Sequence, residues 1–282
     1  MTSLSVSGDA PDYFMQPRMF PMLLLPWWMA GSGERKLDRE FQSDVVYSTL
    51  NGYYYIRLLD NLMDGHGSVE LALLPAAAFF HSEFLLTYQK YFDANHPFWP
   101  VLRSAWFSSS EAIASEESVV CFDEDAFRQI SVQKLCAARI PLAATGYFYR
   151  DVESIKPWLE FTAALASWSQ MLDDVFDWHR DLRDKKDSYV LSQARRHKRE
   201  GETVEAWMAR TGFDWGMSVL SGWLPELRRL AQPLRSAALN RYLDLREEML
   251  EEDKAKLGAG LKTLVEISAV LSSEKNYSAR PN

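Results

Sequence analysis

The sequence predicts an all-α protein built as a single domain. Apolar residues recur with helical spacing along nearly the whole 282-residue chain, and the alternating Val, Ile and Thr runs that are typical of strands are missing. No stretch rich in Pro, Gly or Ser divides the chain, and 47% hydrophobic residues are enough for one large core. We therefore expect a helical bundle around a single core.

Glycines and prolines divide the chain into a series of predicted helices. Breaks are indicated at Gly31, Gly65, Pro97, Gly146, Pro157, Gly212 and Pro233. We expect helices at residues 34–63, 69–92, 97–117, 123–145, 151–182, 188–198, 201–211, 213–230 and 234–258. Residues 1–33 are expected to form an N-terminal segment and residues 34–271 the helical domain. Residues 272–282 are polar, so we expect a disordered tail there.

The apolar stretch at residues 21–29 is interpreted as a buried entry segment. It is well below the ~20 residues of a membrane-spanning helix, and Pro21 and Pro26 interrupt it. We therefore expect no stable membrane anchor, although Trp27 and Trp28 leave contact with a membrane surface open as an alternative.

Charge and cysteine content exclude some functions. The net charge of -8 argues against a nucleic-acid partner, because a phosphate backbone needs a basic face. An acidic protein can still bind a diphosphate if metal ions supply positive charge. The chain has two cysteines, which form neither a disulfide framework nor a zinc pattern, so we expect a cytoplasmic protein.

The first of two aspartate clusters closes the predicted helix 34–63. Asp60 and Asn61 lie in its last turn and Asp64 directly follows it, at the end where carboxylates oppose the helix dipole. Asp60 and Asp64 share one face of a helix because they are four residues apart. An exposed turn that carries two acids by chance is the alternative for this cluster alone.

The second cluster forms a polar stripe on the predicted helix 151–182. Its members are Gln170, Asp173, Asp174, Asp177 and Asp181, whereas the apolar residues between them point elsewhere into packing. So many carboxylates on one stripe repel each other unless a cation lies among them. Two such faces opposed across a bundle therefore predict a site for a hard divalent cation, for which we expect Mg²⁺, and through it a polyphosphate. A solvated acidic face is the alternative.

These residues resemble the class I isoprenoid synthases, and within them the trans-prenyl diphosphate synthases. The family's first motif, DDxxD, is similar to residues 60–64, with Asn61 in the second place. Its second motif, FQxxDDxxD, is similar to residues 170–177 from the Gln onward. Lys134 followed by Gly146 is similar to the family's diphosphate-binding lysine, and residues 185–189 are similar to its Gly-Lys-Ser-Tyr stretch. The resemblance covers roughly residues 40–195.

The resemblance implies a class I terpenoid synthase bundle with a central active-site cavity. Three Mg²⁺ ions would bridge the two acidic faces and the diphosphate of an allylic substrate. The implied catalytic and metal-binding residues are Asp60, Asn61, Asp64, Gln170, Asp173, Asp174, Asp177 and Asp181. The candidates for binding the diphosphate are Lys134, Arg57, Arg180, Lys185, Lys186, Arg241 and Tyr242. The expected pocket residues are Tyr55, Ile56, Phe80, Phe84 and Trp168, whose aromatic members could stabilise a carbocation.

The chain departs from the family just after the first motif. Prenyl diphosphate synthases have an Arg-Arg-Gly there to bind isopentenyl diphosphate, but residues 65–68 read Gly-His-Gly-Ser. Without that cationic clamp we do not expect ordinary chain elongation. Transfer of the prenyl group to a different acceptor is favoured, a terpene cyclase is the second interpretation, and an inactive helical partner protein is the third. Family members commonly form dimers, so the resemblance also raises a homodimer.

Overall fold

The chain is helical throughout the part that the structure describes. The computed structural model describes residues 14, 16, 18–33, 36–63, 72–116 and 122–278. Every regular element in these ranges is a helix, which confirms the predicted all-α class. The helices are α2 (Leu24–Ala30), α3 (Arg39–Met63), α5 (Leu74–Gln89), α6 (Phe98–Glu116), α7 (Glu124–Gln133), α8 (Cys136–Phe148), α9 (Val152–Asp184), α10 (Tyr189–His197), α11 (Val204–Trp207), the π-helix Met208–Gly212, α12 (Phe213–Ala231), the 3₁₀ turn Gln232–Leu234 and α13 (Ala237–Ser278).

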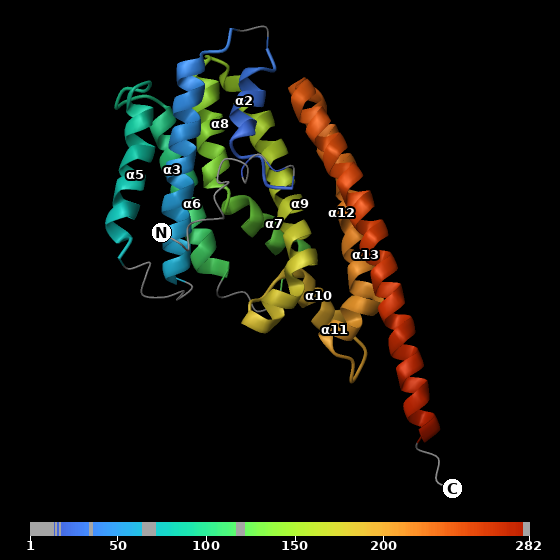
Figure 1. Ribbon diagram of the computed structural model, residues 1–282. Coiled ribbons are helices and arrows are strands. Elements are labelled where there is room, and N and C mark those ends of the chain that lie inside the picture. The colour runs from blue at the N-terminus through green and yellow to red at the C-terminus, as the bar shows by residue number, and fades with distance from the viewer. Residues whose placement is uncertain are drawn as a thin grey trace.

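Helices α8 and α9 pack side by side in the middle of the molecule (Figure 1). Helices α3, α5 and α6 lie on one side of this pair, and α12 and α13 lie on the other. Helices α3 and α9 run in the same direction, so the end of α3 and the second half of α9 lie toward the same end of the bundle, the lower end in Figure 1. The two acidic motifs are carried on these two segments.

The contact between α8 and α9 depends on Gly146, which we expected to break a helix. Helix α8 instead continues through Gly146 to Phe148. A Cβ atom on Gly146 would lie 2.2 Å from Cγ1 of Ile155 on α9. The absence of a side chain therefore serves the close approach of the two helices rather than a turn.

Other predicted boundaries need correction. The single helix expected at 123–145 is two helices, with the break at Lys134 and Leu135. Gly212 does not end a helix either, because the π-helix continues directly into α12. The expected end at residue 258 is wrong, since α13 continues to Ser278. The disordered tail expected from residue 272 stays a prediction. Residues 279–282 and 1–13 lie outside the described residues.

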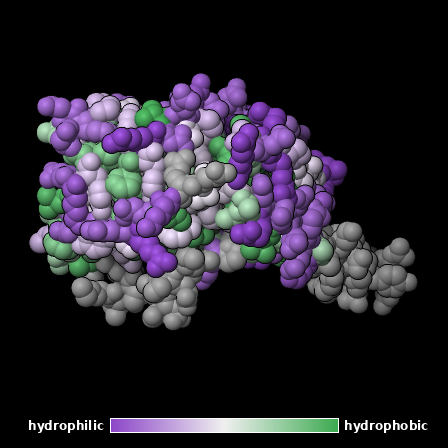
Figure 2. All heavy atoms as spheres, turned by 90° about the horizontal axis from the view of Figure 1, so that it is seen from above, coloured by the Kyte–Doolittle hydropathy of each residue, from purple (hydrophilic) through white to green (hydrophobic). Residues whose placement is uncertain are grey.

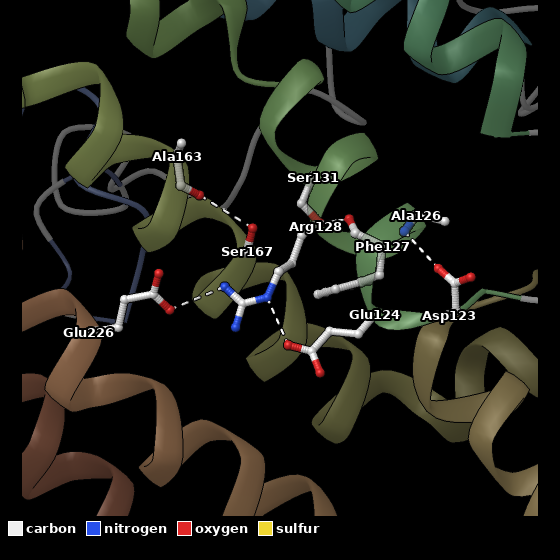
Figure 3. Close-up of polar contacts among 9 residues, drawn as sticks. All are labelled: Asp123, Glu124, Ala126, Phe127, Arg128, Ser131, Ala163, Ser167 and Glu226. Carbon is white, nitrogen blue, oxygen red and sulfur yellow. Dashed lines mark hydrogen bonds and ion pairs between the residues drawn. The ribbon is translucent and has the colours of Figure 1, made fainter. Parts of the chain in front are cut away.

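Helix α7 is fixed against its neighbours by the polar contacts drawn in Figure 3. Asp123 caps its first turn by accepting a hydrogen bond from a backbone N–H. Arg128 contacts Glu124 on the same helix at 2.9 Å and Glu226 on α12 at 3.3 Å. Its guanidinium carbon lies 3.8 Å from the ring centroid of Trp223, which adds a cation–π contact. These contacts connect α7 to α12, the helix that also packs on α9.

The outer face of α5 exposes several large apolar residues. Leu74, Phe79 and Leu86 are 43%, 56% and 51% exposed, and Phe107 on α6 is 63% exposed. Seen from above in Figure 2, hydrophobic residues also gather along the edge where α5 lies in Figure 1. None of the described helices is both long and apolar enough to cross a bilayer.

Candidate active site on helix α9

Helix α9 places its acidic residues along one side because its other faces are buried. Leu165, Trp168 and Met171 are at most 1% exposed, and the Trp168 indole N–H donates to the carbonyl oxygen of Leu220 on α12 at 3.0 Å. This packing fixes the rotation of α9 about its axis. Asp173 is consequently exposed, whereas Asp177 and Asp181 are half-buried.

The carboxylate of Asp173 keeps exposed surface, but the protein around it still shifts its pKa. The surrounding protein raises the pKa of Asp173 to about 6 by desolvation, and the neighbouring Asp177 raises it further. Arg246 and Arg180 act in the opposite direction and lower this pKa. Desolvation and repulsion also raise the pKa of Asp181, with Lys186 among the groups that lower it. Each of these carboxylates would gain from a cation bound between them.

Asp174 has a different role from its neighbours. It is 5% exposed and accepts hydrogen bonds from Nε2 of Gln170 at 2.9 Å and from the backbone N–H of Tyr189 at 3.0 Å. Burial raises the pKa of Asp174 to about 7, although both hydrogen bonds lower it. Both carboxylate oxygens are therefore already engaged, and this residue connects α9 to the start of α10.

Asp177 forms an ion pair with Arg180, three residues further along α9. Both side chains are about half exposed to solvent, so this pair contributes little stability and can open at low cost. Arg180 was expected to bind a diphosphate, and its contact with Asp177 places it beside the stripe. The structure thus brings Arg180, Asp173, Asp177 and Asp181 together on α9.

Arg246 is a cation beside the stripe that sequence reasoning missed. It lies on α13, is 3% exposed, and interacts electrostatically with Asp173. Its guanidinium carbon is 4.8 Å from the ring centroid of Trp168 and 5.9 Å from that of Tyr242. The spacing of residues along α13 gives a signal for this role. Leu239, Leu243, Arg246 and Leu250 follow one another at helical intervals and are buried, and Arg246 is the one charged residue among them.

The first acidic motif lies at the end of α3. The backbone of Asp60 and Asn61 belongs to the last turn of this helix, as predicted. Their side chains, and the whole of Asp64, lie outside the part of the chain that the structure describes. The opposition of the two acidic faces therefore stays a prediction.

The remaining cation candidates are spread over several elements. Lys134 is half-buried at the C-terminal cap of α7, and Arg57 is exposed on α3. Lys185 caps α9 with a left-handed backbone, φ 57°, and the N–H of Lys186 donates to the carbonyl oxygen of Asp181 at 2.9 Å. After this turn the chain reverses direction, so that α10 begins beside Asp174.

The expected pair Arg241 and Tyr242 is divided between two surroundings. Tyr242 is buried, with its ring centroid 5.2 Å from that of Trp28 on α2, whereas Arg241 is exposed. Burial raises the pKa of the Tyr242 hydroxyl to about 12. Adjacent residues on a helix point about 100° apart, so only Tyr242 faces Arg246.

The expected pocket residues fall into two groups. Tyr55 and Phe84 both stack on Trp106, with ring centroids 5.6 and 5.4 Å from that of Trp106. Phe80 packs on Tyr54 of α3 with ring centroids 5.6 Å apart, and Ile56 is half-buried in the same region. Trp168 belongs to the other group, beneath Arg246. None of the five lines the cavity of about 480 Å³ that lies among α6, α7, α8 and α9.

The donor atoms on α9 are of the type that Mg²⁺ prefers. Asp173, Asp177 and Asp181 lie one helical turn apart and present carboxylate oxygens, so they fit one wall of a magnesium site. Among the side chains that the structure describes, no three acids, histidines or cysteines converge into a complete metal site. A second wall is needed, and the residues predicted for it are those at the end of α3.

No protein-family model matches the chain, and no curated protein matches its sequence.

Proposed function

We propose that this protein is a Mg²⁺-dependent class I isoprenoid synthase that ionises an allylic prenyl diphosphate. The observation that carries the proposal is the stripe of Asp173, Asp177 and Asp181 with the buried Arg246 beside it. The pKa values of Asp173 and Asp181 are raised, and shifted carboxylates beside a buried cation are typical of functional sites. The resemblance of residues 60–64 and 170–177 to the motifs of this class supports the same conclusion.

In the proposed reaction the allylic C–O bond breaks, and its electron pair leaves with the diphosphate. Asp173, Asp177 and Asp181 would hold the metal ions, and bound Mg²⁺ would stabilise the negative charge that develops on the leaving group. Arg246 and Arg180 are the cations of this chain that act on Asp173, and Arg246 is the stronger candidate because burial strengthens its electrostatic interactions.

The buried surroundings of Arg246 favour a single orientation of its side chain. Trp168 and Tyr242 contact it, and Arg18 and Asp253 are further charges near it. Arg18 in turn donates two hydrogen bonds to Asp253 on α13, at 2.7 and 2.9 Å. We infer that Arg246 is preorganised for an anion, which avoids the cost of ordering a long side chain during the reaction.

The fate of the cation is the second part of the proposal. We favour transfer of the prenyl group to an acceptor other than isopentenyl diphosphate, because residues 65–68 contain no arginine pair. The test is incubation of the purified protein with Mg²⁺ and geranyl, farnesyl or geranylgeranyl diphosphate, each alone and each with a set of acceptors. Diphosphate release only with an acceptor supports transfer.

Cyclic hydrocarbons formed from one substrate alone would instead assign the protein as a cyclase. Diphosphate release from none of the substrates, with or without an acceptor, contradicts both reactions and leaves an inactive helical partner protein as the better interpretation.

We also propose that the protein forms a homodimer through the outer face of α5. Leu74, Phe79 and Leu86 are exposed apolar residues of this face, and the helix carries only one acid, Glu83, along its whole length. Light scattering should give twice the monomer mass, and Phe79→Glu should reduce it to the monomer value. A wild-type protein that stays monomeric at high concentration contradicts the dimer.

A further inference from the structure

A cavity of about 480 Å³ lies among helices α6, α7, α8 and α9. Its volume is within the range of about 300–1,000 Å³ that is typical of small-molecule sites. On α9 its last residue is Ala163, which precedes Asp173 by about ten residues, or about 15 Å of helix rise. The cavity is therefore a second site, separate from the acidic stripe.

Most of the cavity wall is apolar. Val101 comes from α6, Val132 from α7, and Ile155 and Leu159 from α9. Gly146 allows Ile155 to lie directly against α8, because a Cβ atom there would be 2.2 Å from Cγ1 of Ile155. A wall of this composition favours a hydrocarbon chain.

The polar residues of the cavity are mostly hydrogen-bond donors. Nζ of Lys156 lies 3.8 Å from Oε1 of Glu160, so the positive charge of Lys156 is partly balanced. Arg139 is half-buried, and no acid within the described ranges forms an ion pair with it. The Thr162 hydroxyl is buried and has no hydrogen-bond partner among the described residues. A half-buried guanidinium in an apolar cavity favours an anionic ligand group.

We propose that this cavity binds an amphiphile with one apolar chain and one anionic head group, which Arg139 holds. A carboxylate and a monophosphate share the chemistry that a guanidinium recognises through paired N–H donors. The hydrocarbon chain contacts Val101, Val132 and Leu159. This site goes beyond the proposed synthase reaction, because it uses neither the acidic stripe nor a metal ion.

Binding is tested by isothermal titration calorimetry of the full chain in EDTA, so that no divalent cation assists. The probes are dodecanoate, farnesyl monophosphate and the neutral dodecanol. We expect one anionic probe per chain, bound at least tenfold more tightly than dodecanol. Tighter binding of dodecanoate would indicate a fatty acid as the ligand, and tighter binding of farnesyl monophosphate would indicate a prenyl phosphate. Equal affinity for dodecanol, or no binding of either anion, overturns the proposal.

Variants locate the site. Arg139→Gln should weaken the anionic probe at least tenfold without changing dodecanol binding, and Arg139→Lys should retain part of the affinity. Arg103→Gln is the matched control, since Arg103 is exposed on the same helix as Val101 and does not line the cavity. Val101→Trp should block all three probes by filling the space. Asp173→Asn should bind the anionic probe as the wild type does.

Circular dichroism and the melting temperature must show that each variant is folded. If Arg139→Gln fails to fold, the comparison of Val101→Trp with the control Arg103→Gln still shows whether the probe binds in this cavity. Unchanged binding by a folded Val101→Trp protein places the probe elsewhere and overturns the proposal.

Discussion

The carboxylate of Asp174 accepts a hydrogen bond from the backbone N–H of Tyr189 at 3.0 Å. Tyr189 is the first residue of α10, and the N–H groups in the first turn of a helix have no partner within it. Asp174 therefore caps a neighbouring helix from the side of α9. In a motif that resembles a metal-binding sequence, this aspartate serves the fold. Asp173 instead keeps exposed surface and lies close enough to Asp177 for repulsion to raise its pKa.

This role of Asp174 predicts a pH dependence of stability. Its folded pKa of about 7 lies above the ordinary value of 3.8, so between these values the folded chain holds a proton that the unfolded chain releases. Its contribution to stability is complete at low pH and is lost as the pH rises through 7. In EDTA, the free energy of unfolding from urea titrations should therefore decrease between pH 5 and pH 8.

The variant Asp174→Asn should flatten this dependence, because an amide does not titrate and its oxygen can still accept from Tyr189. At pH 8 it should be more stable than the wild type by up to a few kcal/mol. Asp214→Asn, at an exposed position on α12, is the control and should leave the slope unchanged. If the free energy of unfolding of Asp174→Asn depends on pH as strongly as that of the wild type, the protonation of this carboxyl is not coupled to folding.

The same distinction predicts unequal effects on turnover. Asp173→Asn should reduce diphosphate release by several orders of magnitude, because it removes an exposed carboxylate that the proposal assigns to the metal. Asp174→Asn should retain measurable turnover, since it preserves the capping geometry. Rates come from a continuous diphosphate assay with melting temperatures measured in parallel. Equal loss of activity in both folded variants would mean that Asp174 is also a metal ligand.

Arg246 and Arg241 offer a matched comparison on α13. Arg246→Gln should lower kcat/KM at least tenfold, whereas Arg241→Gln should have a much smaller effect because its side chain is exposed. Loss of Arg246 should also raise the pKa of Asp173 above about 6, because this guanidinium lowers it. The acidic limb of the pH profile of kcat/KM should then move to higher pH. A larger effect of Arg241→Gln reverses our assignment.

Gly146 and Gly222 give opposite predictions for the same substitution. Gly146→Ala would place Cβ 2.2 Å from Cγ1 of Ile155, so we expect a loss of about 1–3 kcal/mol in the free energy of unfolding. Gly222 lies within α12 and has nothing within 4 Å of the added atom. Gly222→Ala should stabilise the protein by about 0.5–1 kcal/mol. Ile155→Ala should relieve part of the Gly146→Ala defect, and a neutral Gly146→Ala would contradict the close contact.

Most of the long helices could be predicted from the sequence because each has a continuous apolar face. Helix α9 was expected at 151–182 and spans Val152–Asp184. The errors occur where tertiary contacts override local signals. The sequence predicts that a helix ends at Gly146. In the structure the helix continues, and the missing side chain of Gly146 leaves space for Ile155. The break at Lys134 has no glycine or proline beside it and therefore gives no local signal.

The candidate site was predictable only in part. Spacing alone places Asp173, Asp177 and Asp181 on one side of a helix, but it cannot tell which aspartate is already hydrogen-bonded. Asp174 is distinguished by its hydrogen bond with the backbone of Tyr189. This residue is 15 positions further along the chain, at the start of the next helix. Arg246 is far from the motifs along the chain, and only the crossing of α13 over Trp168 brings it to Asp173.

The most direct test of the central claim is the binding of an unreactive substrate analogue to the acidic stripe. Calorimetry with the thiolodiphosphates of geraniol, farnesol and geranylgeraniol measures this binding without turnover. Our account predicts that at least one analogue binds the wild type in Mg²⁺ and not in EDTA, and that folded Asp173→Asn loses this binding. Binding that is equally strong in EDTA, or that Asp173→Asn retains unchanged, would contradict the assignment of the α9 stripe as the metal and diphosphate site.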